Sequence, residues 1–230
     1  RTTIEGSRFD GGGIILYDSA GTRVVDTSIT NSGSDGVDLH ANSPNTTFEN
    51  VTVTGSRDYG IAVREGSFGT DRVTVANSTV STNRNGGINL YNAVRSVVRN
   101  STIENNGGIG IRTREGFSDD AMRNGTFTEN TISGNDGEGI TFEDYAADNR
   151  VTNNTITNNN GAGIELGWRG YNGTIFGNVL TGNNIGIGLP SIYDFLTVYN
   201  NHFNKKHANS FKLEITTFKI LILNINKFWI

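Results

Sequence analysis

Cysteine is absent from this chain of 230 residues, and proline occurs only 2 times. The lack of cysteine excludes disulfides and thiolate metal sites. No apolar run reaches the roughly 20 residues that a transmembrane helix needs, so we expect no membrane span. Hydrophobic residues make up 34% of the chain, less than a compact globular core usually contains. With 30 glycines, this composition fits a repeat solenoid, in which each coil needs few inward side chains and many tight turns.

Lysine is absent from the first 204 residues, whose basic residues are all arginine and are outnumbered by Asp and Glu. Such an acidic body argues against a nucleic-acid partner, because phosphate binding relies on a basic surface. It also disfavours tight binding of polyanions unless a local basic patch or a bridging cation is present. The chain begins at Arg1 without a signal-like apolar stretch, which indicates a processed or excerpted piece.

A four-residue step of the form glycine-aliphatic-x-aliphatic recurs along the chain. Its glycines are spaced 23, 24, 27, 23, 29, 24 and 23 residues apart. The copies occupy residues 13–16, 36–39, 60–63, 87–90, 110–113, 139–142, 163–166 and 186–189. Alternation over three or four residues predicts short strands with one buried face. The Asn, Gly, Asp, Ser and Thr residues between the steps favour tight turns.

One period of this repeat has room for two or three short strands with their turns, which is one circuit of a coil. If the coils stack, each strand pairs in parallel with its copy about 4.8 Å away, and like residues lie over like. Three inward columns are then expected. They are Ile14, Val37, Ile61, Ile88, Ile111, Ile140, Ile164 and Ile187; Ile29, Val53, Val80, Ile103, Ile132, Ile156 and Leu180; and Val24, Phe48, Val75, Val98, Phe127, Val151, Ile175 and Val198.

A polar column is expected beside the apolar ones. It consists of Asp26, Asn50, Asn77, Asn100, Glu129, Asn153, Gly177 and Asn200. Stacked amides at a bend can hydrogen-bond from coil to coil and satisfy backbone groups that the bend leaves unpaired. The sequences at Asn77 and Asn100 also read as glycosylation acceptors, but the ladder interpretation is preferred because the repeat alone generates the motif.

The segment Asn-Ser-Thr-Ile-Glu-Asn-Asn-Gly-Gly-Ile-Gly-Ile, residues 100–111, resembles the coil of pectate-lyase-like right-handed β-helix proteins. The resemblance covers roughly residues 8–203 and implies carbohydrate-binding or sugar-cleaving proteins, although such coils also occur in adhesins, tail fibres and accessory modules. Together with the repeat, it predicts an all-β fold: a single-stranded right-handed parallel β-helix (solenoid) of about eight coils.

No further coil is expected after Phe203. The predicted β-helix domain therefore comprises residues 1–203, and residues 204–230 form an atypical tail that contains every lysine of the chain. The tail is either a cap, which a solenoid needs over its open strand edge, or a non-native extension. No catalytic role is assigned to it.

The residue between the two aliphatics of each step is expected to point to solvent, because side chains alternate along a strand. This first outward row is Ile15, Asp38, Ala62, Asn89, Arg112, Thr141, Glu165 and Gly188. A second outward row follows two residues later and is Tyr17, His40, Arg64, Tyr91, Arg114, Glu143, Gly167 and Pro190. The longer coils carry their extra residues in the turn that follows. The rows therefore predict a polar strip walled by loops, where proteins of the resembled fold place an elongated substrate.

One constellation in this strip consists of Asp35, Asp38, His40 and, one coil later, Asp58. It resembles glycoside hydrolases of the polygalacturonase type, and a paired acid and base there would hydrolyse a glycosidic bond. The second coil has one aspartate where that family has two, and the family's downstream Gly-His-Gly and Arg-Ile-Lys segments are missing. The alternative interpretation is that Asp beside Gly merely suits the turn.

A second constellation is Arg64, Arg112 and Arg114 with neighbouring carboxylates that include Glu143. The lyases that the chain resembles use an arginine near a carboxylate-bound Ca²⁺ to remove a sugar-ring proton. Arg is normally too basic for this role, so the reaction needs a strongly perturbed site. The simpler interpretation, which we favour, is an ion pair across coils between Arg114 and Glu143.

Aromatic and polar residues form the remaining candidates. Tyr17, Tyr91 and Trp168 can stack on sugar rings or anchor loops, and Asn89, Tyr91, Glu143, Glu165 and Trp168 are the candidate substrate-binding residues. No metal site is predicted and no cofactor is required. Ca²⁺ on Asp119, Asp120 or Asp144 is a candidate without a loop signature.

Two functions remain open from the sequence. The first is an extracellular or cell-surface protein that binds or cleaves a polysaccharide, by elimination or by hydrolysis. The second is a non-catalytic solenoid that acts as an adhesin, spacer or accessory module. An enzyme needs an acid and a base that converge on one sugar, whereas a spacer spreads its charges evenly. The sugar, the linkage and the oligomeric state are not determined.

Overall fold

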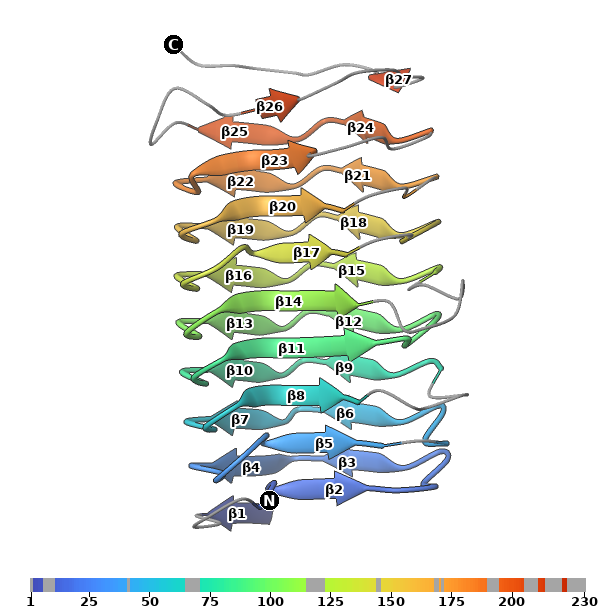
Figure 1. The fold of residues 1–230 in the computed structure, drawn as a ribbon, viewed down its shortest axis with the longest axis vertical. Helices are drawn as coiled ribbons and strands as arrows, with labels where there is room; N and C mark the ends of the chain where they lie inside the picture. Colours follow the sequence, from blue (N-terminus) through green and yellow to red (C-terminus); the bar gives the residue numbers. More distant parts are fainter. Residues whose placement is uncertain are drawn as a thin grey trace.

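The protein is described by a computed structural model that covers residues 2–5, 11–40, 42–64, 71–114, 123–143, 146–167, 170, 172–189, 195–204, 211–213 and 221–222. Within these residues all the regular elements are short β-strands, and every strand pair is parallel. The strands wind around one axis as stacked coils, with the first strand at one end and the last at the other (Figure 1). Within the described residues, no helix is long and apolar enough to span a membrane.

Each coil contributes one strand to sheet A, and this strand follows the sheet C strand in the chain. Its nine strands, in spatial order, are β1 (Thr2–Glu5), β4 (Thr27–Thr30), β7 (Thr52–Thr54), β10 (Thr79–Ser81), β13 (Thr102–Glu104), β16 (Thr131–Ser133), β19 (Thr155–Thr157), β22 (Val179–Thr181) and β25 (His202–Asn204). The register places Ile29 on Val53 and Ile132 on Ile156, as expected for the second inward column.

Sheet B is built by the glycine-aliphatic steps. Its nine strands are β2 (Ile14–Leu16), β5 (Val37–Leu39), β8 (Tyr59–Val63), β11 (Gly86–Tyr91), β14 (Ile109–Arg114), β17 (Ile140–Phe142), β20 (Ala162–Leu166), β23 (Ile185–Leu189) and β26 (Phe211–Leu213). The step glycine must be glycine because the coils approach closely there. A Cβ at Gly36 would lie 2.1 Å from Val53 Cγ1 and 2.6 Å from Gly60 O.

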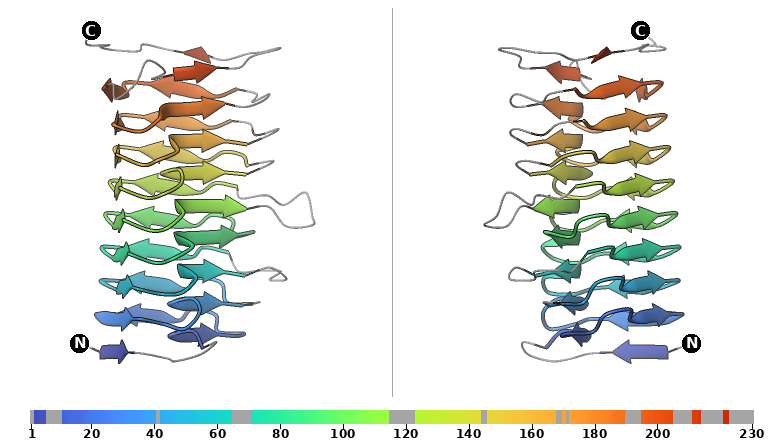
Figure 2. Two further views of the ribbon diagram at one scale, coloured as in Figure 1. Left: turned by 60° about the vertical axis from the view of Figure 1, so that its left-hand side comes forward. Right: turned by 90° about the vertical axis from the view of Figure 1, so that its right-hand side faces the viewer.

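Sheet C completes the circuit. Its nine strands are β3 (Arg23–Val25), β6 (Thr47–Glu49), β9 (Thr74–Ala76), β12 (Val97–Arg99), β15 (Thr126–Thr128), β18 (Arg150–Thr152), β21 (Thr174–Phe176), β24 (Thr197–Tyr199) and β27 (Leu221–Ile222). Figure 2 shows from two further sides how the three sheets stack along the axis. The predicted all-β parallel β-helix is confirmed, and nine strands in each sheet agree with about eight coils.

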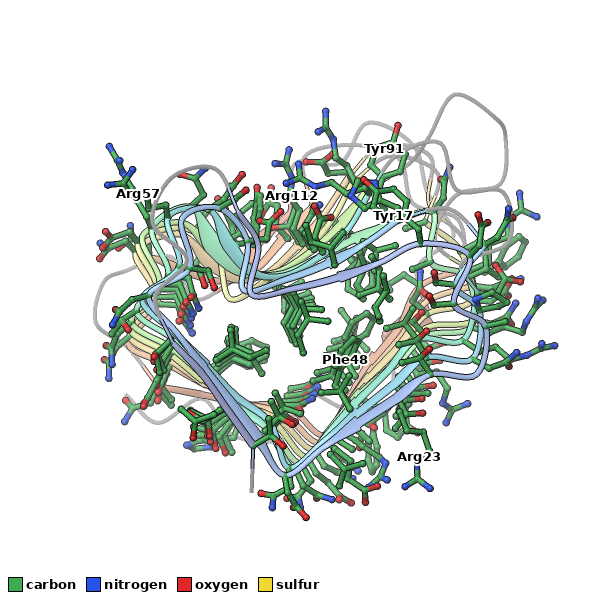
Figure 3. All side chains as sticks on the ribbon, turned by 90° about the horizontal axis from the view of Figure 1, so that it is seen from below. Tyr17, Arg23, Phe48, Arg57, Tyr91 and Arg112 are labelled. Carbon is green, nitrogen blue, oxygen red and sulfur yellow. The ribbon has the colours of Figure 1, made fainter. Side chains whose placement is uncertain are left out.

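The three predicted inward columns are confirmed and form one continuous core. Viewed along the axis, the coils enclose a roughly triangular interior in which Phe48 lies, whereas Arg23 and Arg112 point outward (Figure 3). The buried side chains include Ile29, Phe48 and Ile111, each with 0% of its surface exposed. Burial of one such side chain contributes about 1.5–3 kcal/mol, so the repeated columns supply most of the stability.

Asparagine and serine side chains line two corners of the coil as buried ladders. At the corner between sheets C and A the ladder runs through Ser78, Ser101, Asn130, Asn154, Asn178 and Asn201. At the corner between sheets A and B it runs through Asn83, Asn106, Asn135, Asn159 and Asn183. Each member accepts a hydrogen bond from the backbone N–H of the preceding member, so the ladders satisfy amides that the bends leave unpaired.

The polar column predicted from the sequence lies one residue before the first ladder and is exposed. Asn50 Nδ2 donates to Asp26 Oδ1 over 2.5 Å, and Asn100 Nδ2 donates to Asn77 Oδ1 over 2.6 Å. The prediction of amide contacts between coils is therefore confirmed for these pairs. The backbone of the column is left-handed, with φ of 55° at Asn50 and 48° at Asn100. Asn tolerates this conformation better than most residues, which accounts for its recurrence at the turn.

Two short strands lie beyond Phe203. Strand β26 pairs with β23 and strand β27 pairs with β24, both in parallel. The backbones of these two segments extend sheets B and C although the glycine step is absent, and the domain boundary at residue 203 stays a prediction. The choice between a cap and a non-native extension stays a prediction.

Candidate functional site

The candidate site is the outer face of sheet B, where the first predicted outward row lies in register and, in the second row, Tyr91 pairs with Arg114. Asp38 pairs with Ala62, Ala62 with Asn89 and Asn89 with Arg112. Figure 3 shows Tyr17, Tyr91 and Arg112 on this same side of the coil. Not every member faces solvent. Ala62 is 1% exposed and Tyr91 is 8% exposed, with the Arg114 guanidinium 5.9 Å from the centre of the Tyr91 ring.

Arg64 is the centre of the first charged group on this face. Its Nε donates to Asp38 Oδ1 over 3.1 Å, its Nη2 binds Asp35 Oδ2, and the same Nη2 lies 3.9 Å from Asp58 Oδ2. Burial opposes the charge of the guanidinium, but the three carboxylates together raise the pKa of Arg64 above its usual value. We call Asp35, Asp38, His40, Asp58 and Arg64 the Arg64 cluster.

Asp35 is the buried anchor of the Arg64 cluster. Its side chain has 0% exposure, and its Oδ1 accepts a hydrogen bond from the Tyr59 backbone N–H over 2.8 Å. Burial raises the pKa of Asp35 to about 6, although Arg64 and the Tyr59 N–H both favour the charged form. Because no surface of Asp35 is exposed, this carboxyl group does not face a ligand on sheet B. Its contacts show that it orients Arg64.

His40 completes the cluster at its exposed side. Its Nε2 lies 3.0 Å from Asp38 Oδ2, and its ring stacks on Tyr17 with 4.1 Å between ring centres. The imidazole is 27% exposed and the Asp38 carboxylate is 13% exposed. Asp38 therefore holds an imidazole with one oxygen and a guanidinium with the other. A carboxylate that orients an imidazole in this way fixes its tautomer and its direction.

A second charged group lies two strands beyond β8 in sheet B, on β14 and directly after β17. Arg112 Nε donates to Glu143 Oε1 over 2.6 Å, and Arg114 Nε lies 3.2 Å from Glu143 Oε2. The predicted ion pair across coils between Arg114 and Glu143 is thus confirmed. Burial opposes the charge of Arg112, but hydrogen bonds to Tyr59 and Glu143 raise its pKa. We call Arg112, Arg114 and Glu143 the Arg112 cluster.

Tyr59 is the functional candidate that the sequence analysis missed. Its phenol oxygen accepts a hydrogen bond from Arg112 Nη1 over 3.2 Å, and its backbone N–H binds Asp35. Tyr59 starts strand β8, one residue before a step glycine. The sequence signal for this contact is that Tyr59 aligns with Gly86 one coil later, because a glycine leaves room for the tyrosine ring to lie across the next strand.

The other candidates are spread along the face or lie outside it. Asn89 sits between the two clusters, and Glu165 lies beyond Thr141 in the register of β20. Within the described residues, Asn89 Oδ1 and Thr141 Oγ1 are buried oxygens with no hydrogen-bond partner. Trp168, Asp119, Asp120 and Asp144 lie outside the described residues.

The acidic residues present on sheet B do not fit a calcium site. Asp35, Asp38 and Asp58 converge on the Arg64 guanidinium, which already supplies the positive charge where a cation would bind. Within the described part of the chain, no group of three or more His, Asp or Glu side chains has the geometry to hold a metal ion.

A hollow of about 340 Å³ lies at a different corner, away from sheet B. It is lined by Asp26, Thr27, Ser28, Asn50 and Thr52, at the edge between sheets C and A. These residues belong to the exposed polar column and the threonine-rich face beside it. They contain one carboxylate and no base, so the hollow lacks the chemistry that the face of sheet B carries.

Comparison with known proteins places the chain in a family. The family model described as "Right handed beta helix region" matches residues 12–180 and, in a second match, residues 68–226. The chain therefore belongs to this family, and the right-handed winding predicted for the coil is confirmed. No curated protein matches its sequence.

Several solved structures share the fold at low sequence identity. The periplasmic alginate epimerase AlgG is 17% identical with a TM-score of 0.70, covering 83% of this chain and 47% of AlgG. The pectate lyase Pel9A is 18% identical with a TM-score of 0.64, covering 97% of this chain and 66% of Pel9A. The A-module of the Azotobacter vinelandii mannuronan C-5 epimerase AlgE6 is 14% identical with a TM-score of 0.60, and the match covers 89% of this chain and 57% of the AlgE6 chain. The chain thus spans about half the length of AlgG, and these identities show the fold alone.

Proposed function

We propose that this protein binds a uronate-containing polysaccharide along the outer face of sheet B and removes a ring proton from it at the Arg64 cluster. One observation carries the proposal: Asp38 binds the His40 imidazole with one oxygen and the Arg64 guanidinium with the other. A proton acceptor and a carboxylate-binding group are thereby held side by side on a partly exposed face. The epimerases and the lyase of similar fold act on alginate, mannuronan and pectate by their names, which supports the same class of polymer.

The chemistry follows from the properties of a uronate. Its carboxylate makes the proton on the adjacent ring carbon acidic once a cation or hydrogen-bond donor stabilises the negative charge that develops. In the proposed reaction Arg64 contacts this carboxylate and His40 accepts the proton. The electron pair left on carbon is delocalised into the carboxylate. Return of a proton to the opposite face gives the epimer, whereas loss of the neighbouring glycosidic oxygen gives a double bond and a new chain end.

Hydrolysis by the aspartates is less well supported. A hydrolase needs two carboxyl groups that face the glycosidic bond from either side. Asp35 and Asp38 instead both bind Arg64, and Asp35 has 0% exposure. The raised pKa of Asp35 would suit an acid, but its position beneath the face would not.

The location of the protein is part of the proposal. We infer an extracellular, cell-surface or periplasmic location, where polysaccharides of this class are found. AlgG, which shares the fold, is a periplasmic protein, and this supports the inference.

The decisive test is exchange of the ring proton with solvent. The protein is incubated in D₂O with alginate, polymannuronate, polygalacturonate and a neutral polysaccharide, with Ca²⁺ and then with chelator. Deuterium on the ring carbon beside the carboxylate, detected by NMR, reports proton removal followed by return of a proton from solvent. Elimination leaves that carbon in a double bond without hydrogen, and the ultraviolet absorbance of this double bond reports it. We expect exchange with a uronate polymer, abolished in His40→Gln and Asp38→Asn. The matched control is His202→Gln on sheet A, which should behave as wild type.

A non-catalytic solenoid is the second candidate, because the charged groups of the face already pair with each other. Asp35, Asp38 and Asp58 all contact Arg64, and Glu143 contacts both arginines of its cluster. Binding of a uronate polymer with neither deuterium incorporation nor formation of an unsaturated chain end would favour this candidate over an enzyme. Absence of both binding and exchange across the panel would reject the proposed function.

A further inference from the structure

We infer that Tyr59 is a positioning residue that holds Arg112 as a second anion-binding point on the same face, so that one polysaccharide chain contacts both charged clusters. This inference rests on the proposed function and specifies how the site is extended. It makes the length of the acidic polymer, and not only its composition, a determinant of binding.

The backbone of Tyr59 belongs to the Arg64 cluster. Its N–H donates to Asp35 Oδ1 over 2.8 Å, and its carbonyl oxygen accepts the Gly36 N–H over 3.0 Å. Asp35 in turn binds Arg64. The position of the Tyr59 main chain is therefore tied to the same carboxylate that orients the guanidinium of the proposed reaction centre.

The side chain of Tyr59 belongs to the Arg112 cluster. Tyr59 pairs with Gly86 in the register of β8 and β11, and a Cβ at Gly86 would lie 2.8 Å from Tyr59 Cε1. The ring thus lies over Gly86, where any side chain would obstruct it. The side chain extends from β8 across β11, and its phenol oxygen accepts the hydrogen bond from Arg112 Nη1 on β14.

The charge of the face changes between the two clusters. The Arg64 cluster combines one arginine with three aspartates, whereas the Arg112 cluster combines two arginines with Glu143. The second cluster, with its excess of positive charge, can therefore bind a further carboxylate of the polymer at some distance from the first. Strands β8 and β14 are two strand spacings apart, or roughly 10 Å. Only a ligand of several sugars reaches from one cluster to the other.

The test uses Tyr59→Phe, which keeps the backbone contact to Asp35 and removes only the phenol oxygen. Binding is measured by calorimetry with mannuronate and galacturonate oligomers of defined length, from the disaccharide to long chains. Loss of one hydrogen bond of ordinary net strength, by which Arg112 is held in place, predicts about five- to tenfold weaker binding of the long oligomers. We expect unchanged binding of the disaccharide, an unchanged melting temperature and, where turnover occurs, a raised KM with the same kcat.

Two further variants sharpen the test. Tyr199→Phe removes a phenol oxygen from sheet C and should bind every oligomer as wild type does. In an Arg112→Ala background, Tyr59→Phe should have no additional effect, because the group that it positions is gone. The inference is overturned if Tyr59→Phe binds long oligomers as tightly as wild type, or weakens short and long oligomers equally. If the wild-type protein binds no uronate oligomer, the proposed function itself fails.

Discussion

Asn154 in the buried ladder offers the strictest test of what holds the coils together. Its Oδ1 accepts hydrogen bonds from the Asn130 backbone N–H over 2.9 Å and from Asn130 Nδ2 over 3.0 Å. Its Nδ2 donates to Phe127 O and Asn178 Oδ1, each over 2.9 Å. Asn154→Ala leaves the Asn130 N–H buried without this partner, at about 1–3 kcal/mol, and removes three further bonds of roughly 1 kcal/mol each. The expected loss of stability is about 4–6 kcal/mol.

The assay is urea unfolding followed by circular dichroism, combined with hydrogen exchange of the Asn130 amide. A solenoid can open locally, and the exchange rate reports the ladder directly. Asn154→Ser should lose less, because Ser101 occupies the equivalent position and its Oγ accepts the Ser78 N–H over 3.1 Å. The control Asn160→Ala removes one exposed bond of 3.3 Å and should cost no more than about 0.5 kcal/mol. Equal midpoints for Asn154→Ala and Asn160→Ala would refute the reasoning.

Other predictions concern the buried carboxyl group and the step glycine. Burial raises the pKa of Asp35 from 3.8 to about 6, so folding favours its protonated form, and stability falls as pH rises from about 4 to 6. The loss of unfolding free energy over this pH range approaches about 3 kcal/mol. Chemical unfolding at several pH values should show no such loss for Asp35→Asn. Parallel pH profiles of the variant and the wild type would contradict the raised pKa of Asp35. Gly36→Ala should lower the melting temperature markedly, because its Cβ would lie 2.1 Å from Val53 Cγ1. Gly21→Ala, with a φ of 71° but nothing within 4 Å of its Cβ, should cost only about 1 kcal/mol, and equal losses would rule out the steric explanation.

The fold could be predicted because one physical constraint repeats. Each circuit must bury its own aliphatic positions and then let the next circuit approach closely. The glycine-aliphatic steps meet both requirements: the aliphatic residues are buried, and the glycine leaves room for the next coil. Gly36, for example, lies close to Val53 and to the Gly60 carbonyl oxygen. A register error of one residue would turn a whole inward column to solvent, so the alternation specified the pairing. The sheets therefore agree with the predicted columns throughout the body of the chain.

The ladders show where the repeat was insufficient. Asn153 and Asn154 are adjacent and recur with the same period, so either column could have been the buried one. The backbone decides between them. Asn153 has a left-handed φ of 56° and is exposed, whereas Asn154 points into the corner and is 1% exposed. The local conformation of the bend, and not the identity of the residue, assigns the two roles.

The sequence by itself determined that this chain is a stack of parallel coils, which residues form its core and which rows face outward on sheet B. It also placed Asp35, Asp38, His40 and Asp58 near one another, since neighbouring coils bring neighbouring copies together. Only the tertiary structure decided which of these groups bind each other. The carboxylates meet on Arg64, and Tyr59 reaches Arg112 from 53 residues away in the chain. Such contacts depend on how side chains lean from one coil to another, and a period of about two dozen residues carries no information on that direction.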